Sequence, residues 1–157
     1  LGIKCKCIRC REGGLQSRLI DDNNIIMNRI DYDASNGKEI FLSMESKDSE
    51  SMLGFLRMRN TFSAGRKELK DVNQSIKNAV VIRELHVYGK LLDIGNKKND
   101  ESFQHRGLGK KLMKEAERIA REELNVKKIS VISAIGTREY YKKMGYFING
   151  PYVSKLV

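Results

Sequence analysis

The residues best suited to chemistry lie in three short segments, of which the first opens a helix. Gln104, Gly107 and Gly109 belong to the run Gln-His-Arg-Gly-Leu-Gly, which follows a polar loop. Glycines let the backbone approach a ligand closely, and the free amides of a first helical turn point toward an anion. The run predicts a phosphate-binding helix start, although two glycines before a helix also fit an ordinary helix start.

The second group of residues consists of a strand segment and a tyrosine pair that lies further along the chain. Residues 84–87 lie on the strand upstream of that helix. If this strand and the strand at 129–133 separate at their ends, unpaired backbone groups become available to an extended, amide-bearing ligand through strand addition. Tyr140 and Tyr141 lie further along the chain, and a tyrosine hydroxyl placed there can donate a proton to a departing thiolate.

The third segment contains every cysteine of the chain, Cys5, Cys7 and Cys10, in a C-x-C-x-x-C pattern. Three thiolates this close suit a tetrahedral zinc ion that takes its fourth ligand from elsewhere. Three cysteines on one short segment cannot form a framework of disulfide bonds across a fold, so we expect a reducing, cytoplasmic setting. Residues 1–20 are predicted to be a cysteine-bearing linker.

Charge points to a polyanionic partner. Lys and Arg number 30 against 20 Asp and Glu, which gives a net charge of +10. Such an excess suits a nucleic acid or a phosphorylated cofactor, whereas ordinary solubilisation by lysine is the alternative. The candidate nucleic-acid contacts are Lys4, Lys6, Arg9, Arg11, Lys111 and Lys114. For the helical lysines, a solvated helix surface is an equally good interpretation.

The elements of the first half are predicted to be mostly strands. A length of 157 residues suits one globular domain, and the absence of an apolar stretch of about 20 residues excludes a membrane-spanning helix and a membrane partner. Asn36 and Gly37 predict a type I′ hairpin turn. Strands are predicted at 25–33, 38–45, 52–58 and 79–88, the last central and covered on both faces, with polar connections at 61–77 and 93–102.

In the second half of the chain, the spacing of the apolar residues changes to that of a helix. One helical face carries Leu108, Leu112, Met113, Ala116, Ile119 and Ala120. A buried strand at 128–133, a short helix at 137–144 that ends at Gly145, and terminal strands within 146–156 follow. This order predicts an α/β fold, with antiparallel strands ahead of an alternating strand and helix arrangement in one mixed sheet.

Two motifs are similar to those of the Gcn5-related N-acetyltransferase (GNAT) family. Its pyrophosphate loop, Q/R-x-x-G-x-G/A, matches residues 104–109, and its later pattern, Y-x-K-x-G-F/Y, matches residues 141–146. The segments KCKCIRCRE, RELHVYG, FQHRGLGKKLMKEAERIAREE and GTREYYKKMGYFINGPYVSKL resemble the Elongator catalytic subfamily, the tRNA carboxymethyluridine synthases. The resemblance implies a GNAT domain over 21–157 with a mixed, mostly antiparallel sheet flanked by helices. The family's usual first two helices are not recognisable.

The resemblance also implies a ligand, acetyl-CoA, and roles for individual residues. The amides of Leu108, Gly109 and Lys110 would hold the pyrophosphate, and Gln104 and Gly107 would shape the loop. Glu84, Leu85, His86 and Val87 would line the pantetheine and the acetyl carbonyl. Tyr141 would face the sulfur as the proton donor, with Tyr140 as packing or support and a second candidate for the same role.

Partners follow from the same resemblance. Full-length members carry an N-terminal radical S-adenosylmethionine domain with an iron-sulfur cluster, and zinc is associated with the cysteine region. We therefore expect a fragment of a longer protein, weakly active alone, whose partners are tRNA, that missing domain and, in a eukaryote, other Elongator subunits. In the full protein, acetyl-CoA would be hydrolysed or used to carboxymethylate carbon 5 of the wobble uridine. The alternatives are a histone-like protein lysine acetyltransferase and a catalytically silent tRNA-binding module.

Overall fold

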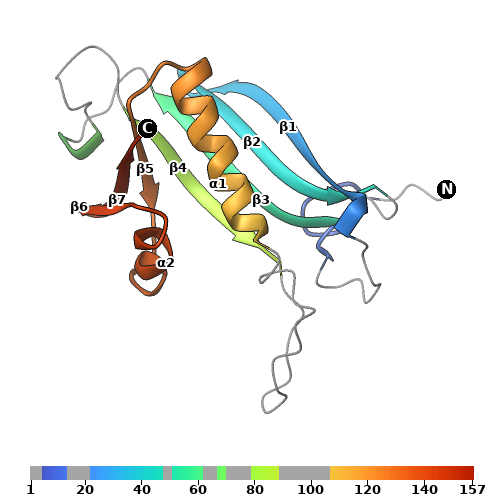
Figure 1. The fold of residues 1–157 in the computed structure, drawn as a ribbon. Coiled ribbons are helices and arrows are strands. Elements are labelled where there is room, and N and C mark those ends of the chain that lie inside the picture. Colours follow the sequence, from blue (N-terminus) through green and yellow to red (C-terminus); the bar gives the residue numbers. More distant parts are fainter. Residues whose placement is uncertain (1–4, 14–21, 48–50, 62–66, 70–78, 89–106) are drawn as a thin grey trace.

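The computed structural model describes residues 5–13, 22–47, 51–61, 67–69, 79–88 and 107–157. Within these ranges, seven strands form one mixed sheet in the order β1-β2-β3-β4-β5-β7-β6, and α1 lies across one face of it (Figure 1). The strands are β1 (Ile25–Ala34), β2 (Gly37–Ser46), β3 (Met52–Thr61), β4 (Val80–Val87), β5 (Lys128–Ile132), β6 (Phe147–Asn149) and β7 (Tyr152–Leu156). The mixed α/β fold predicted from the sequence is confirmed.

The helices are fewer than the strands in the described ranges. They are α1 (Leu108–Arg118), which continues as a π-helix (Ile119–Glu123), α2 (Arg138–Lys142), and short 3-10 helices at Asp22–Asn24, Lys67–Leu69 and Ile135–Thr137. None of the helices in this part of the chain is both long and apolar enough to cross a membrane. Of the predicted connection at 61–77, Thr61 ends β3 and Lys67–Leu69 forms a helical turn. The predicted loop at 93–102 lies outside the described residues.

A two-residue turn joins β1 directly to β2. The predicted hairpin is present, but its central residues are Ser35 and Asn36, with φ of 48° and 57°, so placing the turn at Asn36 and Gly37 was wrong by one residue. Gly37 belongs to β2, where a Cβ would lie 2.9 Å from the carbonyl oxygen of Asn60 on β3. Glycine is needed there for close strand packing, and the positive φ falls on the preceding pair.

A bulge divides β4 at Arg83. On β3, Met58 lies opposite Ile82, whereas the preceding Arg57 lies opposite Glu84, so Arg83 is an extra residue without a partner in the ladder. Such a bulge shifts the alternation of the strand by one position. Val80 and Ile82 face the core under α1 before the bulge, and the side chains that pack against that core after it are Leu85 and Val87.

The bulge corrects one expectation for this strand. Only Val80, Val81 and Ile82 are buried on both faces, whereas Arg83, Glu84 and His86 are exposed. The prediction that the whole strand is covered on both faces was therefore wrong. The apolar run of the sequence ends at Ile82, and the second half of β4 has one face toward the core and one toward solvent.

The two central parallel strands separate beyond the bulge. β4 pairs with β5 only through Val80, Val81 and Ile82, yet β4 continues to Val87 while β5 ends at Ile132. The edge of β4 that faces β5 is thus unpaired with it over the second half of the strand. The condition that strand addition requires, a separation of these two strand ends, is therefore met, and Figure 1 shows the two strands diverging toward α2.

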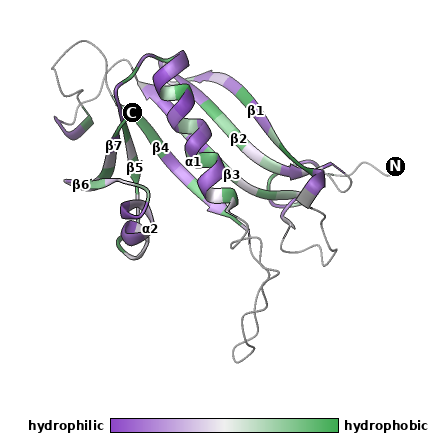
Figure 2. Cartoon of the chain, viewed as in Figure 1, coloured by the Kyte–Doolittle hydropathy of each residue, from purple (hydrophilic) through white to green (hydrophobic). Residues whose placement is uncertain are grey.

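The long helix α1 covers the core. All six residues of its predicted apolar face are buried, namely Leu108, Leu112, Met113, Ala116, Ile119 and Ala120. The side of α1 that is turned away from the sheet is largely hydrophilic (Figure 2). Burial of this stripe against the sheet fixes the axis of α1, and it therefore fixes where the first turn of the helix lies relative to the diverging strands.

Candidate active site

A cavity of about 570 Å³ lies between the second half of β4, the first turn of α1 and α2. Its lining includes Leu85 and Val87 from β4, Gly107, Gly109 and Lys110 from the start of α1, and Gly136, Thr137, Tyr140 and Tyr141 from the segment after β5. Seven of these nine residues are candidates from the sequence. Residues far apart in the chain therefore meet in one cavity.

The first turn of α1 presents to this cavity backbone donors that have no partner within the helix. Gly107 adopts the left-handed conformation, with φ of 71°, and its carbonyl accepts the helical bond from the Lys111 amide at 3.0 Å. The N-cap makes no side-chain capping bond, and the first turn contains no acidic residue. The amides of Leu108, Gly109 and Lys110 precede the first possible helical donor, so they are open to an anion at the positive end of the helix dipole.

Gly109 is where the helix approaches the cavity wall most closely. A Cβ at this position would lie 2.6 Å from the hydroxyl of Tyr140 and 3.4 Å from Val87 Cγ2. The Tyr140 hydroxyl thus lies beside the first turn of α1, and its ring is 37% exposed. A side chain at this position would displace the Tyr140 hydroxyl and occupy the space between helix, strand and tyrosine.

Tyr141 is the more deeply placed of the two tyrosines. It is 5% exposed, and its ring packs edge-on against Tyr140 and Tyr146, with centroid distances of 5.2 and 5.9 Å. Burial, and secondarily the neighbouring Tyr140, raises the pKa of the Tyr141 hydroxyl to about 12. At neutral pH this hydroxyl is therefore protonated and can only act as a hydrogen-bond or proton donor toward a developing anion.

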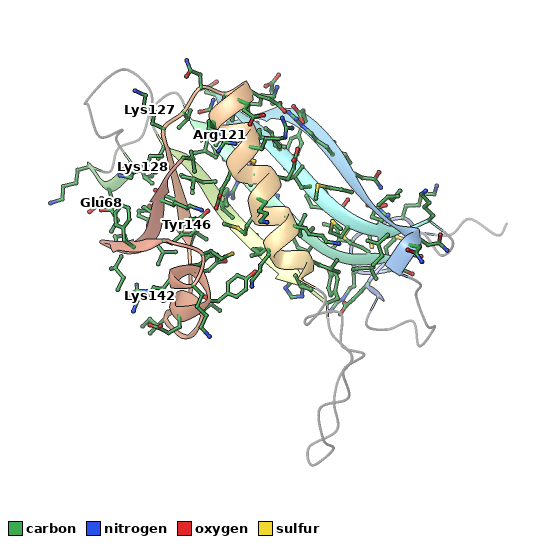
Figure 3. The ribbon with its side chains drawn as sticks, in the orientation of Figure 1. Glu68, Arg121, Lys127, Lys128, Lys142 and Tyr146 are labelled. Carbon is green, nitrogen blue, oxygen red and sulfur yellow. The ribbon has the colours of Figure 1, made fainter. Side chains whose placement is uncertain are left out.

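A polar network behind Tyr141 was not predicted from the sequence. The Tyr146 hydroxyl donates to Glu117 Oε1 at 2.9 Å, and Lys155 donates to Glu117 Oε2 at 2.9 Å. Burial raises the pKa of Tyr146, whose position between α1 and the C-terminal strands is labelled in Figure 3. The network ties the ring that supports Tyr141 to α1. The sequence signal was Tyr146 itself, the last residue of the Y-x-K-x-G-Y motif.

Two further cavity residues, Gly136 and Thr137, were also missed. They belong to the 3-10 helix that leads into α2, and Thr137 donates its hydroxyl to the carbonyl of Ala134 at 3.0 Å. They open the segment GTREYYKKMGYFINGPYVSKL, but no role was assigned to them, because a short turn of small residues is common in loops. Their place in the cavity lining beside Leu85 and Val87 follows only from the tertiary structure.

The candidates on β4 divide between two faces of the sheet. Leu85 and Val87 line the cavity, whereas the side chains of Glu84 and His86 line a separate hollow of about 420 Å³ together with Phe55, Arg57 and Tyr88. Side chains of a strand alternate between faces, so four consecutive residues cannot all point into one cavity. Glu84 and His86 can contribute to the cavity only through their backbone.

The cysteine segment lies apart from the cavity. Cys5, Cys7 and Cys10 are exposed, and their sulfur atoms all lie within 4.8 Å of one another. The Cys10 amide donates to Cys7 Sγ at 3.5 Å, and this bond lowers the pKa of Cys7 to about 7. The pKa of Cys10 is raised to about 11 by its interactions with the other two thiols. Three converging sulfurs, one readily ionised, fit three corners of a tetrahedral metal site.

The candidate nucleic-acid contacts do not form one surface. Lys111 and Lys114 are exposed on α1, whereas Arg9 lines the hollow on the opposite face of the sheet and Arg11 pairs with Glu45. Lys6 is exposed on the cysteine segment. Lys4 and Gln104 lie outside the described residues.

Comparisons with known proteins define the class. The model of the acetyltransferase (GNAT) family matches residues 30–146, so the chain belongs to this family. The chain is 44% identical over 158 residues to the "tRNA uridine(34) acetyltransferase" of Methanocaldococcus jannaschii and 42% identical over 160 residues to human "Elongator complex protein 3". These alignments cover 98% and 100% of the chain. The resemblance inferred from the motifs is confirmed.

A solved structure agrees with these relatives. The archaeal Methanocaldococcus infernus Elp3 with an N-terminal deletion (1–46) superposes with a TM-score of 0.82 at 44% identity, over 99% of this chain and 36% of that one. The chain spans about 28% of the length of the curated relatives it matches. The match therefore concerns one domain of larger proteins.

Proposed function

We propose that the cavity binds acetyl-CoA and that the chain is the acyltransferase domain of a tRNA uridine-modifying enzyme. The observation that carries the proposal is the meeting of an uncapped helix start with an unpaired strand edge in one cavity. The amides of Leu108, Gly109 and Lys110 would hold the diphosphate. The free edge of β4 beyond Ile82 would pair with the amides of an extended pantetheine arm.

The chain's own residues suggest how the site would work. Acetyl-CoA supplies an acetyl group activated as a thioester. The Tyr141 hydroxyl holds its proton at neutral pH, and from the cavity wall it can donate that proton to the sulfur as negative charge develops there. The edge of β4 beyond Ile82 is not paired with β5, and a backbone amide on this edge could polarise the acetyl carbonyl. Gln104 would complete the loop before the helix.

The substrate assignment rests on the names of the relatives. Because relatives at 44% identity are named tRNA uridine(34) acetyltransferases, tRNA is the proposed acceptor, with acetyl-CoA hydrolysed or used to carboxymethylate carbon 5 of the wobble uridine. A preceding radical S-adenosylmethionine domain with an iron-sulfur cluster would provide the radical, in a cytoplasmic protein that a eukaryote would assemble into Elongator. Lys6, Arg9, Lys111 and Lys114 would contribute salt-sensitive contacts to the RNA backbone.

Calorimetry tests the cofactor. A non-hydrolysable acetyl-CoA analogue is titrated into the chain and into the Gly109→Val variant, whose side chain would enter the space between Val87 and Tyr140. We expect binding to the wild type and at least about tenfold weaker binding to the variant, since the added side chain fills the cavity mouth. No binding to the wild type, or equal binding to both, would contradict the proposal.

The cysteines are proposed to hold zinc with a fourth ligand from outside the described residues. Their exposed sulfurs all lie within 4.8 Å of one another, so small side-chain rotations would bring the three of them onto one tetrahedral ion. Metal content is measured by elemental analysis for the wild type and for Cys7→Ser. We expect zinc in the wild type, its loss in the variant, and unchanged binding of the acetyl-CoA analogue in both, because the cysteine segment lies outside the cavity lining.

A further inference from the structure

A second hollow lies on the face of β4 opposite the acetyl-CoA cavity. Its volume is about 420 Å³, within the range of roughly 300–1,000 Å³ typical of ligand sites. The lining residues are Ile8, Arg9 and Glu12 from the cysteine segment, Phe55 and Arg57 from β3, and Glu84, His86 and Tyr88 from β4 and the residue after it. The acyl chemistry proposed above uses none of these side chains.

Aromatic rings form a continuous stack in this hollow. Phe55 lies 5.5 Å from Phe41 and 5.8 Å from His86, with interplanar angles of 27° and 18°. The His86 ring in turn lies 4.6 Å from Tyr88, with the two rings tilted by 58°. Phe55 and Tyr88 are 4% and 7% exposed, whereas His86 is exposed. His86 is therefore the member of the aromatic cluster that solvent and a further flat ring can reach.

The polar groups of the hollow suit an uncharged ring with both donors and acceptors. Arg57 and Glu84 form an ion pair at 3.5 Å, with side chains 39% and 44% exposed, and Tyr32 is a second partner of Arg57. An exposed ion pair of this kind contributes little stability, so Glu84 can turn to a ligand at small cost while Tyr32 keeps Arg57 beside the hollow. Carboxylate oxygens accept hydrogen bonds and a guanidinium donates them, which matches the mixed edge of a nucleobase. The charges of the lining balance, since Arg9 and Arg57 are offset by Glu12 and Glu84.

We infer that this hollow binds a single unstacked nucleobase of an RNA substrate, which would stack on His86 and bond through its edge to Glu84 and Arg57. The inference rests on the proposed function, because that function supplies RNA as the acceptor. Single-stranded bases are recognised by stacking on aromatic side chains together with hydrogen bonds to their edges. β4 then separates two sites, with acetyl-CoA on one face of the strand and the base on the other.

Binding of a labelled RNA tests the inference. A short single-stranded RNA that carries one 2-aminopurine is titrated into the full chain, and the quenching of its fluorescence on stacking is followed. His86→Ala should weaken binding about tenfold and abolish the quenching, since one base stack contributes on this order. His86→Phe retains a ring and should bind within about twofold of the wild type. The matched control is Phe147→Ala, which removes an aromatic residue of 47% exposure on the remote strand β6.

Photocrosslinking and cofactor titration separate the outcomes. RNA that carries 4-thiouridine should crosslink to the rings of the hollow, and the acetyl-CoA analogue should bind His86→Ala as it binds the wild type. RNA binding that is unchanged in His86→Ala, with crosslinks elsewhere, would overturn the inference while the proposed function stands. Crosslinks in the hollow without any binding of the acetyl-CoA analogue would support the inference and defeat the cofactor assignment. Absence of RNA binding would overturn both the inference and the proposed acceptor.

Discussion

Arg83 divides β4 into two halves that follow each other directly in the sequence but differ in role. Val81 and Ile82 pair with β3 on one edge and with β5 on the other, Val80 pairs with β5, and all three are buried. Beyond Arg83, the strand pairs with β3 alone, and its side chains alternate between the cavity and the hollow. A strand paired on both edges has no backbone groups left for a ligand, whereas one paired on a single edge retains a row of them. One inserted residue thus separates scaffold from site.

Arg83 is also held in place by charge. Its guanidinium donates to Glu39 Oε1 at 2.8 Å, and the same oxygen accepts from Arg59 at 2.7 Å. Glu39 is 2% exposed, and removing one partner of a buried ion pair is costly, so the two arginines are structurally important neighbours of this carboxylate. The arrangement ties the bulge to β2 and β3 and gives the extra residue a role beyond its effect on strand geometry.

The largest difference between the halves should be in stability. Ile82→Ala deletes a fully buried side chain and should lower the free energy of unfolding by about 2–5 kcal/mol. Leu85→Ala, at a partly buried position after the bulge, should lower it by less than half as much. Urea unfolding followed by circular dichroism measures both. Equal losses of unfolding free energy would show that the two halves of β4 contribute equally to the stability of the core.

The next effect concerns turnover at the half-paired end. Tyr141→Phe keeps the packed ring but removes the hydroxyl, so release of free CoA in the presence of tRNA should fall about a hundredfold, while affinity for the acetyl-CoA analogue stays the same. Tyr140→Phe is the matched comparison, because its hydroxyl lies beside Gly109 instead. A loss of turnover in Tyr140→Phe alone would exchange the roles of the two tyrosines.

Removing the bulge should erase the distinction between the halves. Deletion of Arg83 leaves Val80, Ile82, Leu85 and Val87 on the core face, in regular alternation with Val81, Glu84 and His86, and it removes only the bend and added twist that the bulge gives the strand. Affinity for the acetyl-CoA analogue should fall about tenfold to a hundredfold, since a straightened β4 would no longer diverge from β5 and would present less free edge to the ligand. Arg83→Ala keeps the extra residue and loses only its ion pair, so its affinity should change by less than about threefold. Calorimetry measures both variants, with circular dichroism as the check of folding.

The smallest effect should appear at alkaline pH. The pKa of Tyr141 in the folded chain is raised from its ordinary value of 10 to about 12, so the unfolded chain loses this proton first. Stability from this group is complete below pH 10 and declines as pH rises toward 12. Thermal unfolding between pH 9 and pH 11 should show a smaller decline in Tyr141→Phe than in the wild type. Identical declines would mean that Tyr141 does not titrate on unfolding in this range.

Much of the site could be read from local pattern. The glycines at 107 and 109 and the apolar stripe of α1 correctly indicated the helix and its first turn, because helical period and glycine conformation depend on neighbours in the chain. The motif around Tyr141 also indicated Tyr140 and Tyr141, which both line the cavity. The turn at Ser35 and Asn36 was displaced by one residue, since the packing of Gly37 against β3 is invisible to a pattern of adjacent residues.

The sequence by itself determined which segments are strands and helices, and where an anion could meet a helix. Only the tertiary structure decided that Arg83 is a bulge, that β4 and β5 part after Ile82, and that Glu84 and His86 face a second hollow. These features depend on the register between strands that lie tens of residues apart. A single unpaired residue in such a register reverses which side chains share a face, and local sequence carries no record of it.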